Sequence, residues 1–354
     1  MNIFSYSEDF HRIFDKTAFI WDDLRGMRLF LTGGTGFFGR WLLESLVWAN
    51  EHYDLNASVL VLTRNSESFE KSAPEIASNP SISFHKGDIR LFDFPEGKFT
   101  HIIHGATTAA EETFLGQDPL LKFDTVAQGT RRVLDFAVQC GVKKFLHLSS
   151  GSAYGKQPSD MIHIPESYPG APLTTDNNFD HSALGEGKRA AELLCTIYSA
   201  KYGIETKIAR CFSFVGPGLP LDIHYAIGNF IRDGLKRREI RVNGDGSQFR
   251  SYLYAADLVL WLWTILINGK SSRIYNVGSD ESVTIKELAY LVASCFEPTS
   301  KVVITKFQKI KTPENRYVPS INRVRMELGL EVYTPLHDSI IKTIFFYKKL
   351  RPTV

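Results

Sequence analysis

Three glycines spaced three residues apart are the feature that most constrains the fold of this chain. Gly33, Gly36 and Gly39 follow a short apolar run at residues 28–31 and precede a helical pattern at residues 40–51. A strand, a glycine turn and a helix in this order let a pyrophosphate approach the helix N-terminus closely. This context favours a dinucleotide site over a merely flexible turn. The predicted contacts in the turn are Gly33, Thr35, Gly36, Phe37, Phe38 and Gly39.

Short β-rich runs alternate with longer helical patterns through the first two thirds of the chain. The runs are residues 28–31, 59–63, 82–85, 101–104, 145–149 and 207–211. The helical stretches between them include residues 40–51 and 125–139. Right-handed crossovers between such units give a parallel sheet wrapped by helices. The sequence therefore predicts an α/β fold, a Rossmann doubly wound parallel sheet with a smaller C-terminal lobe.

The pattern becomes irregular after Cys211, where two glycine-rich turns at residues 216–218 and 244–246 interrupt it. We expect two lobes to result. Their predicted boundaries place residues 1–211 and 251–279 in the Rossmann domain and residues 212–250 and 280–354 in the smaller lobe. Because ligands of doubly wound sheets bind at the carboxyl ends of the strands, the smaller lobe should complete the ligand site there.

Residues 1–26 form an extension that precedes the first predicted strand. Within it, residues 9–21 have the pattern of an amphipathic helix. Its apolar side chains are expected to cover the sheet or a partner subunit, and they are Phe10, Ile13, Phe14 and Phe19.

Composition limits the partners and the location of the chain. A formal net charge of +2, with no basic stripe, argues against nucleic acid as a partner. The four cysteines are scattered without Cys-x-x-Cys spacing, so neither a metal site nor a disulfide framework is predicted. The amino terminus lacks a signal-peptide pattern, and the apolar stretch at residues 258–267 is too short to span a bilayer. We therefore expect a cytoplasmic protein that does not enter the membrane.

The ends of the predicted strands bear on the choice of dinucleotide. Arg64 follows the second strand, where an NAD-specific enzyme usually carries an acid that binds the ribose hydroxyls. Arg64 can instead pair with a ribose 2′-phosphate, which favours NADP over NAD, although exposed arginines are equally common past strand ends. Asp88 and Ile89 follow the third strand and are expected to bracket the adenine. The segment after the fourth strand is expected to line the dinucleotide through Gly105, Ala106 and Thr107.

Several further motifs, in this order, make the chain similar to the extended short-chain dehydrogenase/reductase family. Besides the glycine turn, they lie at residues 148–155, 187–192, 210–217 and 244–257. The resemblance covers nearly all of the chain from Met27 onward. The family comprises nucleotide-sugar epimerases, dehydratases and decarboxylases, so the resemblance implies an NAD- or NADP-dependent enzyme that acts on a nucleotide-diphosphate sugar.

The resemblance implies catalytic roles for two residues and exposes one departure. In the family, the residue at the position of Ser150 hydrogen-bonds the sugar hydroxyl that is oxidised, and the lysine matched by Lys188 binds the nicotinamide ribose. A tyrosine four residues before that lysine acts as the base, but this chain has Leu184 there. Because an aliphatic side chain can neither accept nor donate a proton, the usual relay is absent.

Three explanations of Leu184 are open. It is an engineered substitution in a tyrosine enzyme, a natural loss in an impaired homologue that still binds both ligands, or a sign that another group supplies the base. His181 is the preferred substitute, since the unperturbed pKa of histidine lies close to working pH. The other candidates for that group are Tyr154, Asp180 and Glu186.

A second departure bears on the reaction. Dehydratases of the family follow the serine or threonine with an Asp-Glu pair, whereas this chain has Gly151 and Ser152. This disfavours elimination and leaves oxidation or reduction at a sugar carbon, C4 by preference, as in epimerases and 4-ketoreductases. Glu111 and Glu112 are other possible carboxylates, so a 4,6-dehydratase or a decarboxylase remains the alternative.

The substrate contacts are expected at the carboxyl ends of the strands and in the smaller lobe. Arg250 stands where the family binds the diphosphate, and its guanidinium can hold two phosphate oxygens at once. Arg316 is a second candidate for that contact, while Ser150 and Ser152 are expected to touch the sugar. The resemblance also implies a homodimer formed through paired helices, here residues 125–139 and 188–202.

Overall fold

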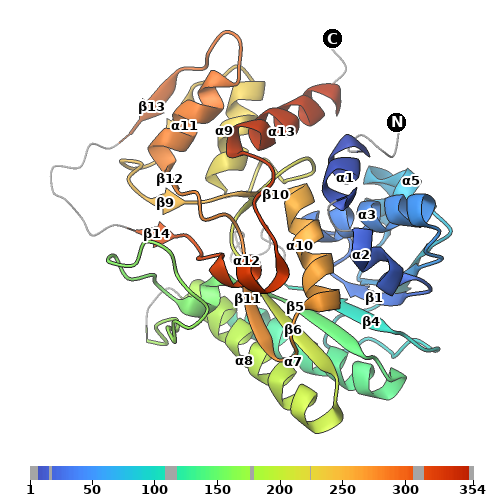
Figure 1. The fold of residues 1–354 in the computed structure, drawn as a ribbon. Coiled ribbons are helices and arrows are strands. Elements are labelled where there is room, and N and C mark those ends of the chain that lie inside the picture. Colours follow the sequence, from blue (N-terminus) through green and yellow to red (C-terminus); the bar gives the residue numbers. More distant parts are fainter. Residues whose placement is uncertain are drawn as a thin grey trace.

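The computed structural model describes residues 7–15, 18–107, 118–175, 179–223, 225–305 and 315–350. Within them, seven parallel strands form the central sheet in the order β11-β6-β5-β4-β1-β2-β3 (Figure 1). The strands are β1 (Arg28–Thr32), β2 (Ser58–Thr63), β3 (Ile82–Lys86), β4 (His101–His104), β5 (Lys144–Ser150), β6 (Glu205–Cys211) and β11 (Arg273–Val277). The strand order reverses beside β1, so the predicted doubly wound α/β fold is confirmed.

All six predicted strands are present, and each is matched or extended by one or two residues. The edge strand β11 was not predicted. Its sequence places Arg273, Tyr275 and Asn276 among only two aliphatic residues, which gives a weak hydrophobic pattern. Pairing with β6 along the whole length of β11, and not local preference, makes it a strand.

Helices cover both faces of the sheet. One face carries α3 (Phe37–Tyr53) and α10 (Ala255–Asn268), and the other carries α7 (Pro119–Cys140) and α8 (Phe179–Tyr202) (Figure 1). Alternation along β1 sends Leu29 and Leu31 into the core beneath α3 and α10, while Phe30 joins the core beneath α7. Every residue of α10 from Ala255 to Ile267 is buried, so the apolar stretch at residues 258–267 is part of a core helix.

Local capping explains why the helices start earlier than predicted. The Asp118 side chain accepts a hydrogen bond from the Leu120 amide (3.0 Å), and Pro119 occupies the first helical position of α7. The same helix ends at Gly141, whose φ of 72° is a left-handed conformation that glycine adopts without strain. Gly36 is the N-cap of α3, which therefore begins at Phe37, within the glycine turn.

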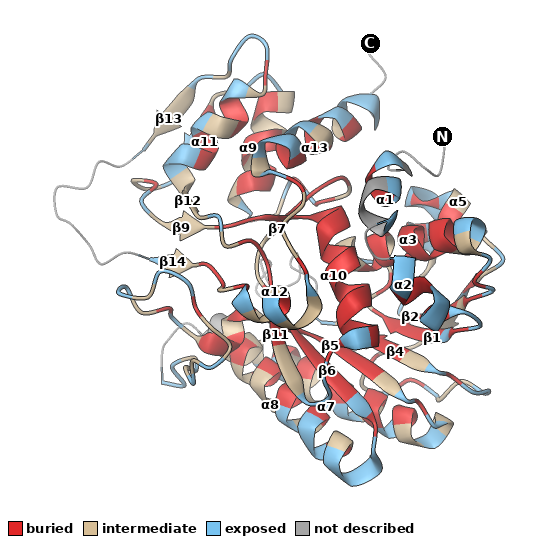
Figure 2. Ribbon diagram, viewed as in Figure 1, coloured by how far each residue is buried: buried red, intermediate tan, exposed pale blue. Residues whose placement is uncertain are grey.

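The smaller lobe has its own apolar core. Phe230, Leu288 and Ile340 meet there from α9 (Ala226–Leu235), α11 (Ile285–Ser294) and α13 (Leu336–Leu350). The short strands outside the central sheet are β7 (Phe214–Val215), β8 (Ile240–Val242), β9 (Phe249–Arg250), β10 (Leu253–Tyr254), β12 (Val283–Thr284), β13 (Val302–Ile304) and β14 (Arg316–Tyr317). Figure 2 shows buried residues concentrated in the sheet and α10, with exposed residues on the outer helix faces. The domain boundaries given above stay a proposal.

The N-terminal extension differs from the single predicted helix. It forms α1 (Ser7–Phe14) and α2 (Ala18–Trp21), and α1 packs against α3 and α10. Asp9 is buried and accepts hydrogen bonds from the Tyr254 hydroxyl (2.8 Å) and the Lys342 ammonium (2.6 Å). The extension thereby joins the sheet side of the molecule to α13. Among the described helices, none has the length and apolar character needed to cross a membrane.

Phe10 anchors the extension, and its loss should destabilise the fold. The ring is buried and packs edge-on against Trp41 at 5.7 Å, whereas Phe19, predicted on the same apolar face, is 59% exposed. Phe10→Ala should lower the free energy of unfolding by about 3–5 kcal/mol, because the cavity forms in a packed aromatic cluster. Phe19→Ala, the matched control, should change it by less than about 0.5 kcal/mol. Urea unfolding of both variants checks this, and equal effects would contradict it.

Candidate active site

The glycine turn and the segment after β4 lie backbone against backbone. A Cβ on Gly33, whose φ is +75°, would stand 2.7 Å from the carbonyl carbon of Gly105. A Cβ on Gly39 would stand 2.3 Å from the Cα of Gly34, so only glycine fits at both positions. The Ala106 amide donates to the Thr32 hydroxyl (3.1 Å), which fixes the second segment against the first. The sequence predicted the turn and the Gly105–Ala106 segment as two separate contacts for the dinucleotide. The structure brings them together.

The two phenylalanines of the turn lie at the junction with the smaller lobe. Phe38 packs edge-on against Phe214 with ring centroids 4.8 Å apart, and Phe37 packs against the apolar core of the smaller lobe. Thr35 is half-buried, and Thr107 is exposed. Thr35 and the two phenylalanines follow the carboxyl end of β1, and Thr107 follows that of β4.

A charge cluster lies at the ends of β2 and β3. Arg90 donates to both carboxylate oxygens of Asp88, at 2.9 and 3.0 Å, and this pair holds the pKa of Asp88 below its usual range. The nearby charge of Arg64 acts in the same direction. Ile89 is buried against Gly129 of α7. Sequence reasoning missed Arg90, although an arginine two residues after an aspartate in a tight turn can indicate a local ion pair.

The Lys188 side chain extends to the carboxyl-terminal part of β5, the strand that ends at Ser150. The Lys188 ammonium is buried and donates to the carbonyl oxygen of Leu148 (2.7 Å), two residues before Ser150. Burial lowers the pKa of Lys188 to about 8. The Ser150 hydroxyl accepts from the Ser152 amide (3.1 Å) at the start of the short 3₁₀ helix Gly151–Tyr154.

Two hydroxyls beside this site are orphaned. Those of Ser152 and Ser251 are buried without a hydrogen-bond partner among the described residues. Buried polar groups are normally satisfied, so each is a candidate contact for a polar ligand. Ser251 directly follows Arg250, whose guanidinium donates to the Phe249 carbonyl (2.7 Å) and whose pKa is lowered by burial.

The helix that carries Lys188 approaches the Gly151–Tyr154 turn closely at Gly185. A Cβ there would stand 2.7 Å from the Ser152 carbonyl oxygen, and the adjacent Leu184 is half-buried one helical turn before Lys188. His181 belongs to the same helix, but its side chain lies outside the described residues. The side chain of Asp180 is likewise outside them, as are Glu111 and Glu112 altogether.

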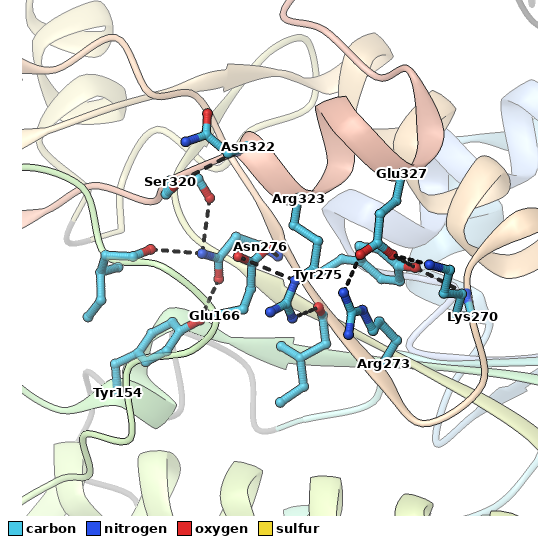
Figure 3. A network of polar contacts seen from close by, with 12 residues as sticks. Tyr154, Glu166, Lys270, Arg273, Tyr275, Asn276, Ser320, Asn322, Arg323 and Glu327 are labelled. Atoms are coloured by element: carbon cyan, nitrogen blue, oxygen red, sulfur yellow. Dashed lines mark hydrogen bonds and ion pairs between the residues drawn. The ribbon is translucent and has the colours of Figure 1, made fainter.

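Tyr154 does not face the site. Its hydroxyl donates to the Asn276 side chain (2.8 Å), and its ring lies under the Arg210 guanidinium at 4.2 Å. Asn276 in turn donates to the carbonyl oxygens of Ile164 (2.9 Å) and Ser320 (3.1 Å), as Figure 3 shows. Tyr154 is therefore held as a structural group, which removes it from the candidates for the base.

A buried ion pair lies beside Ser149, the neighbour of Ser150, and one helical turn after Lys188 on α8. Glu192 of α8 accepts from Arg210 of β6 at 2.9 and 2.5 Å, and from the Ser149 hydroxyl at 2.5 Å. Both charged groups are nearly inaccessible to solvent. The pair ties α8 to β5 and β6, so it sets the position of the helix that carries Leu184 and Lys188.

The three-stranded sheet of the smaller lobe delivers Tyr317 to the same place. Tyr317 is paired in register with Arg250, its ring lies 4.7 Å from that of Phe212, and its hydroxyl oxygen lies 2.6 Å from where a Cβ on Gly151, the residue after Ser150, would stand. The neighbouring Arg316 guanidinium stacks 3.9 Å above the Phe249 ring. Sequence reasoning missed Tyr317, because no local pattern indicates which residue of a distant strand reaches this end of β5.

Comparison with known proteins identifies the family. A model of the NAD dependent epimerase/dehydratase family matches residues 29–278, which include the glycine turn, Ser150 and Lys188. The chain belongs to this family. Membership confirms the predicted family and the predicted class of enzyme, and the family's dependence on NAD confirms a nicotinamide dinucleotide as the class of cofactor.

Relatives within the family are similar over most of their length. UDP-glucuronic acid decarboxylase 3 of Arabidopsis thaliana is 28% identical over 321 residues, which cover 89% of this chain and 87% of that protein. The dTDP-glucose 4,6-dehydratase of Streptomyces venezuelae, solved with NAD and TYD bound, has a TM-score of 0.74 at 25% identity and covers 91% and 97% of the two chains. The UDP-glucose 4-epimerase of Thermotoga maritima shares the fold, with a TM-score of 0.76 at 22% identity over 92% and 99%.

The buried lysine of this family member should lower its stability. Lys188 has a pKa of about 8 when folded, below its ordinary value of 10.5, so the unfolded chain binds more protons between these two pH values. The cost of burying the charge is therefore fully present below pH 8 and falls as pH rises through this window. Lys188→Met should raise the free energy of unfolding at pH 7 by about 1–3 kcal/mol, and the gain should shrink towards pH 10.

Urea unfolding at pH 7 and pH 10 measures this gain. Lys71→Met, at an exposed position on another helix, is the matched control and should show no comparable gain. A Lys188→Met protein that is less stable than the wild type at pH 7 would contradict this expectation.

Proposed function

We propose that the chain oxidises or reduces a carbon, C4 by preference, of a nucleoside-diphosphate sugar, as 4-epimerases and 4-ketoreductases do. The observation that carries this proposal is the convergence of three groups at one end of the sheet. The glycine turn adjoins Gly105, Lys188 bonds the backbone two residues before Ser150, and the strand that pairs with Arg250 brings Tyr317 against Gly151 from the other lobe. The names of the relatives, which act on UDP- or dTDP-sugars, support the same class of substrate.

The residues fit a nicotinamide dinucleotide. Side chains at Gly33 and Gly39 would collide with neighbouring backbone, and the N-cap Gly36 makes no side-chain cap, so the first turn of α3 offers its amides to a pyrophosphate. When bound, the dinucleotide gives or takes the hydride. Lys188 would hold the nicotinamide ribose, and Ser150 would hold the reacting sugar hydroxyl.

Decarboxylation is the second candidate, because the relatives by sequence include UDP-glucuronic acid decarboxylases. Loss of carbon dioxide from a carboxyl group on C5 requires a ketone at C4, which stabilises the resulting carbanion as an enolate. The first step is therefore the same oxidation at C4. Dehydration is supported less, because Gly151 and Ser152 supply no carboxylate beside the site.

The function proposed here does not require a tyrosine at residue 184. His181 stays a candidate for the base, and an impaired homologue that only binds both ligands stays the alternative. Ser152, Arg250 and Arg316 are proposed to contact the sugar nucleotide. Of the two arginines, Arg250 is the better placed, since Arg316 is stacked on an aromatic ring.

A homodimer is part of the proposal. The outer faces of α7 and α8 carry apolar side chains that are exposed to solvent. These are Leu120, Phe123, Leu193 and Ile197. Exposed apolar side chains one helical turn apart are typical of helices that pack against a partner. Leu193 and Ile197 lie within residues 188–202 of the proposed contact, whereas Leu120 and Phe123 precede its other part, residues 125–139, on the same helix.

Substrate conversion and the role of Arg250 can be tested together. The protein with NAD or NADP should convert at least one of UDP-glucose, UDP-glucuronic acid and dTDP-glucose, with the product identified by mass spectrometry and NMR. Arg250→Ala should weaken binding of that sugar nucleotide about tenfold or more, because charge-assisted hydrogen bonds to the diphosphate are lost. Dinucleotide binding should stay nearly unchanged in calorimetry.

Arg241→Ala is the matched control, since this arginine is 68% exposed on β8. It should leave both affinities unchanged. Binding of both ligands without any product would favour the impaired homologue, and an Arg250→Ala protein with full affinity would reject the diphosphate contact.

The choice of dinucleotide is a separate proposal. Arg64 lies past the end of β2, close enough to Asp88 to influence its pKa, and we propose that it pairs with the 2′-phosphate of NADP. NADP should then bind more tightly than NAD, and Arg64→Ala should narrow the difference about tenfold by weakening NADP binding alone. Equal dissociation constants for the two dinucleotides in the unmodified protein would refute it.

A further inference from the structure

Leu184 leaves the proposed reaction without a proton donor at the usual place. Oxidation of a sugar hydroxyl releases one proton, and reduction of a sugar ketone consumes one. The group that moves this proton must lie beside Ser150, where the proposed function places the reacting oxygen. The inference below rests on that proposed function.

Tyr317 is a titratable side chain that the smaller lobe brings to the carboxyl end of β5. Its hydroxyl lies against Gly151, the residue that follows Ser150, and Cys211 is the residue opposite Ser150 on β6. The ring is held by Phe212 at a centroid distance of 4.7 Å. A phenol therefore stands at the end of β5 although residue 184 supplies none.

Gly151 makes room for this phenol. A Cβ at residue 151 would stand 2.6 Å from the Tyr317 hydroxyl oxygen and 2.9 Å from the Phe212 ring. Contacts this short do not occur, so any side chain at residue 151 would displace Tyr317. Gly151 stands where the dehydratases of the family carry the first acid of their Asp-Glu pair. Its missing side chain leaves the space that the Tyr317 hydroxyl occupies.

The backbone around Tyr317 is fixed on both sides. Tyr317 pairs in register with Arg250 of β9, and the next residue, Val318, donates its amide to the Gln157 side chain (3.0 Å). The Val318 carbonyl accepts from the Ile164 amide (2.9 Å). Rigid support of this kind is what holds a reacting group in one geometry.

We propose that Tyr317 is the residue that exchanges a proton with the reacting sugar oxygen, in place of the tyrosine that Leu184 displaces. In reduction, the ketone carbon receives a hydride and its oxygen takes the Tyr317 phenol proton, which leaves a hydroxyl and a phenolate. The phenolate then takes a proton from water. In oxidation, the phenolate removes the hydroxyl proton, and the phenol passes it to water.

The surroundings suit this role. Burial raises the pKa of Tyr317 to about 12, so the phenol is protonated at neutral pH and ready to act as an acid. The nearby Ser150 hydroxyl and the charge of Arg250 act in the opposite direction and lower the pKa of Tyr317. These two groups would also support the anion formed in the transfer.

Removal of one oxygen atom tests the proposal. Tyr317→Phe should reduce turnover of the sugar nucleotide roughly 10²–10⁴-fold, because a positioned proton-transfer group is lost. Dissociation constants for the dinucleotide and the sugar nucleotide, measured by calorimetry, should stay within about threefold of wild type. Tyr275→Phe is the matched control, since this buried tyrosine bonds Glu327 on the far side of β11 and should keep the wild-type rate.

A second substitution separates proton transfer from packing. Leu184→Tyr places a phenol one helical turn before Lys188, so in the Tyr317→Phe background it should restore turnover at least about tenfold. A tyrosine that acts only by packing against Phe212 could not be replaced from α8. Failure of this rescue, or a Tyr317→Phe protein with the wild-type rate, would overturn the inference and leave the proposed function standing.

The remaining outcomes are also decisive. If the wild type is inert and Leu184→Tyr alone is active, Tyr317 does not transfer the proton, and the inference is overturned while the proposed substrate class is retained. If neither protein converts or binds any sugar nucleotide, the proposed function fails and the inference fails with it.

Discussion

The ion pair between Glu192 and Arg210 is the interaction on which the candidate site depends. Burying two charges costs several kcal/mol for each ion, so such a pair persists only when further hydrogen bonds complete it. Here the Ser149 hydroxyl bonds the carboxylate and the Tyr154 ring covers the guanidinium. Loss of either charged partner would leave the other uncompensated, at a cost of about 3–5 kcal/mol. The pair therefore fixes α8 against β5 and β6, and with it the position of Lys188.

The same network continues into the smaller lobe. Tyr154 bonds Asn276, and Asn276 bonds the carbonyl oxygens of Ile164 and Ser320 (Figure 3). Of these two residues, Ser320 lies on the segment that follows β14. Ile164 also pairs with the segment around Val318. Groups from α8 and from β14 are thus positioned by one continuous set of buried contacts. A displacement at Glu192 would be felt at both ends of the site.

The parts of this site that the sequence predicted are those that local patterns specify. Alternation of strands and helices located six strands, and the glycine spacing located the turn after β1. Tyr317, Asn276 and the strand β11 escaped, because each acquires its place through pairing with chain segments distant in sequence. The extension was predicted as one helix because its apolar residues recur at helical spacing. Only the packed structure shows that Phe10 is buried and Phe19 is exposed.

Leucine at residue 184 is compatible with this fold for a physical reason. A buried tyrosine needs a partner for its hydroxyl, whereas a half-buried leucine leaves no polar atom unsatisfied, so the substitution costs α8 no hydrogen bond. The Tyr317 hydroxyl lies on the other side of this end of β5, against Gly151. A side chain at residue 151 would displace Tyr317, so the glycine and the tyrosine depend on each other. If Tyr317 exchanges the proton, as proposed, the chemical step is supplied from β14 while the buried network of Glu192 and Arg210 stays unchanged.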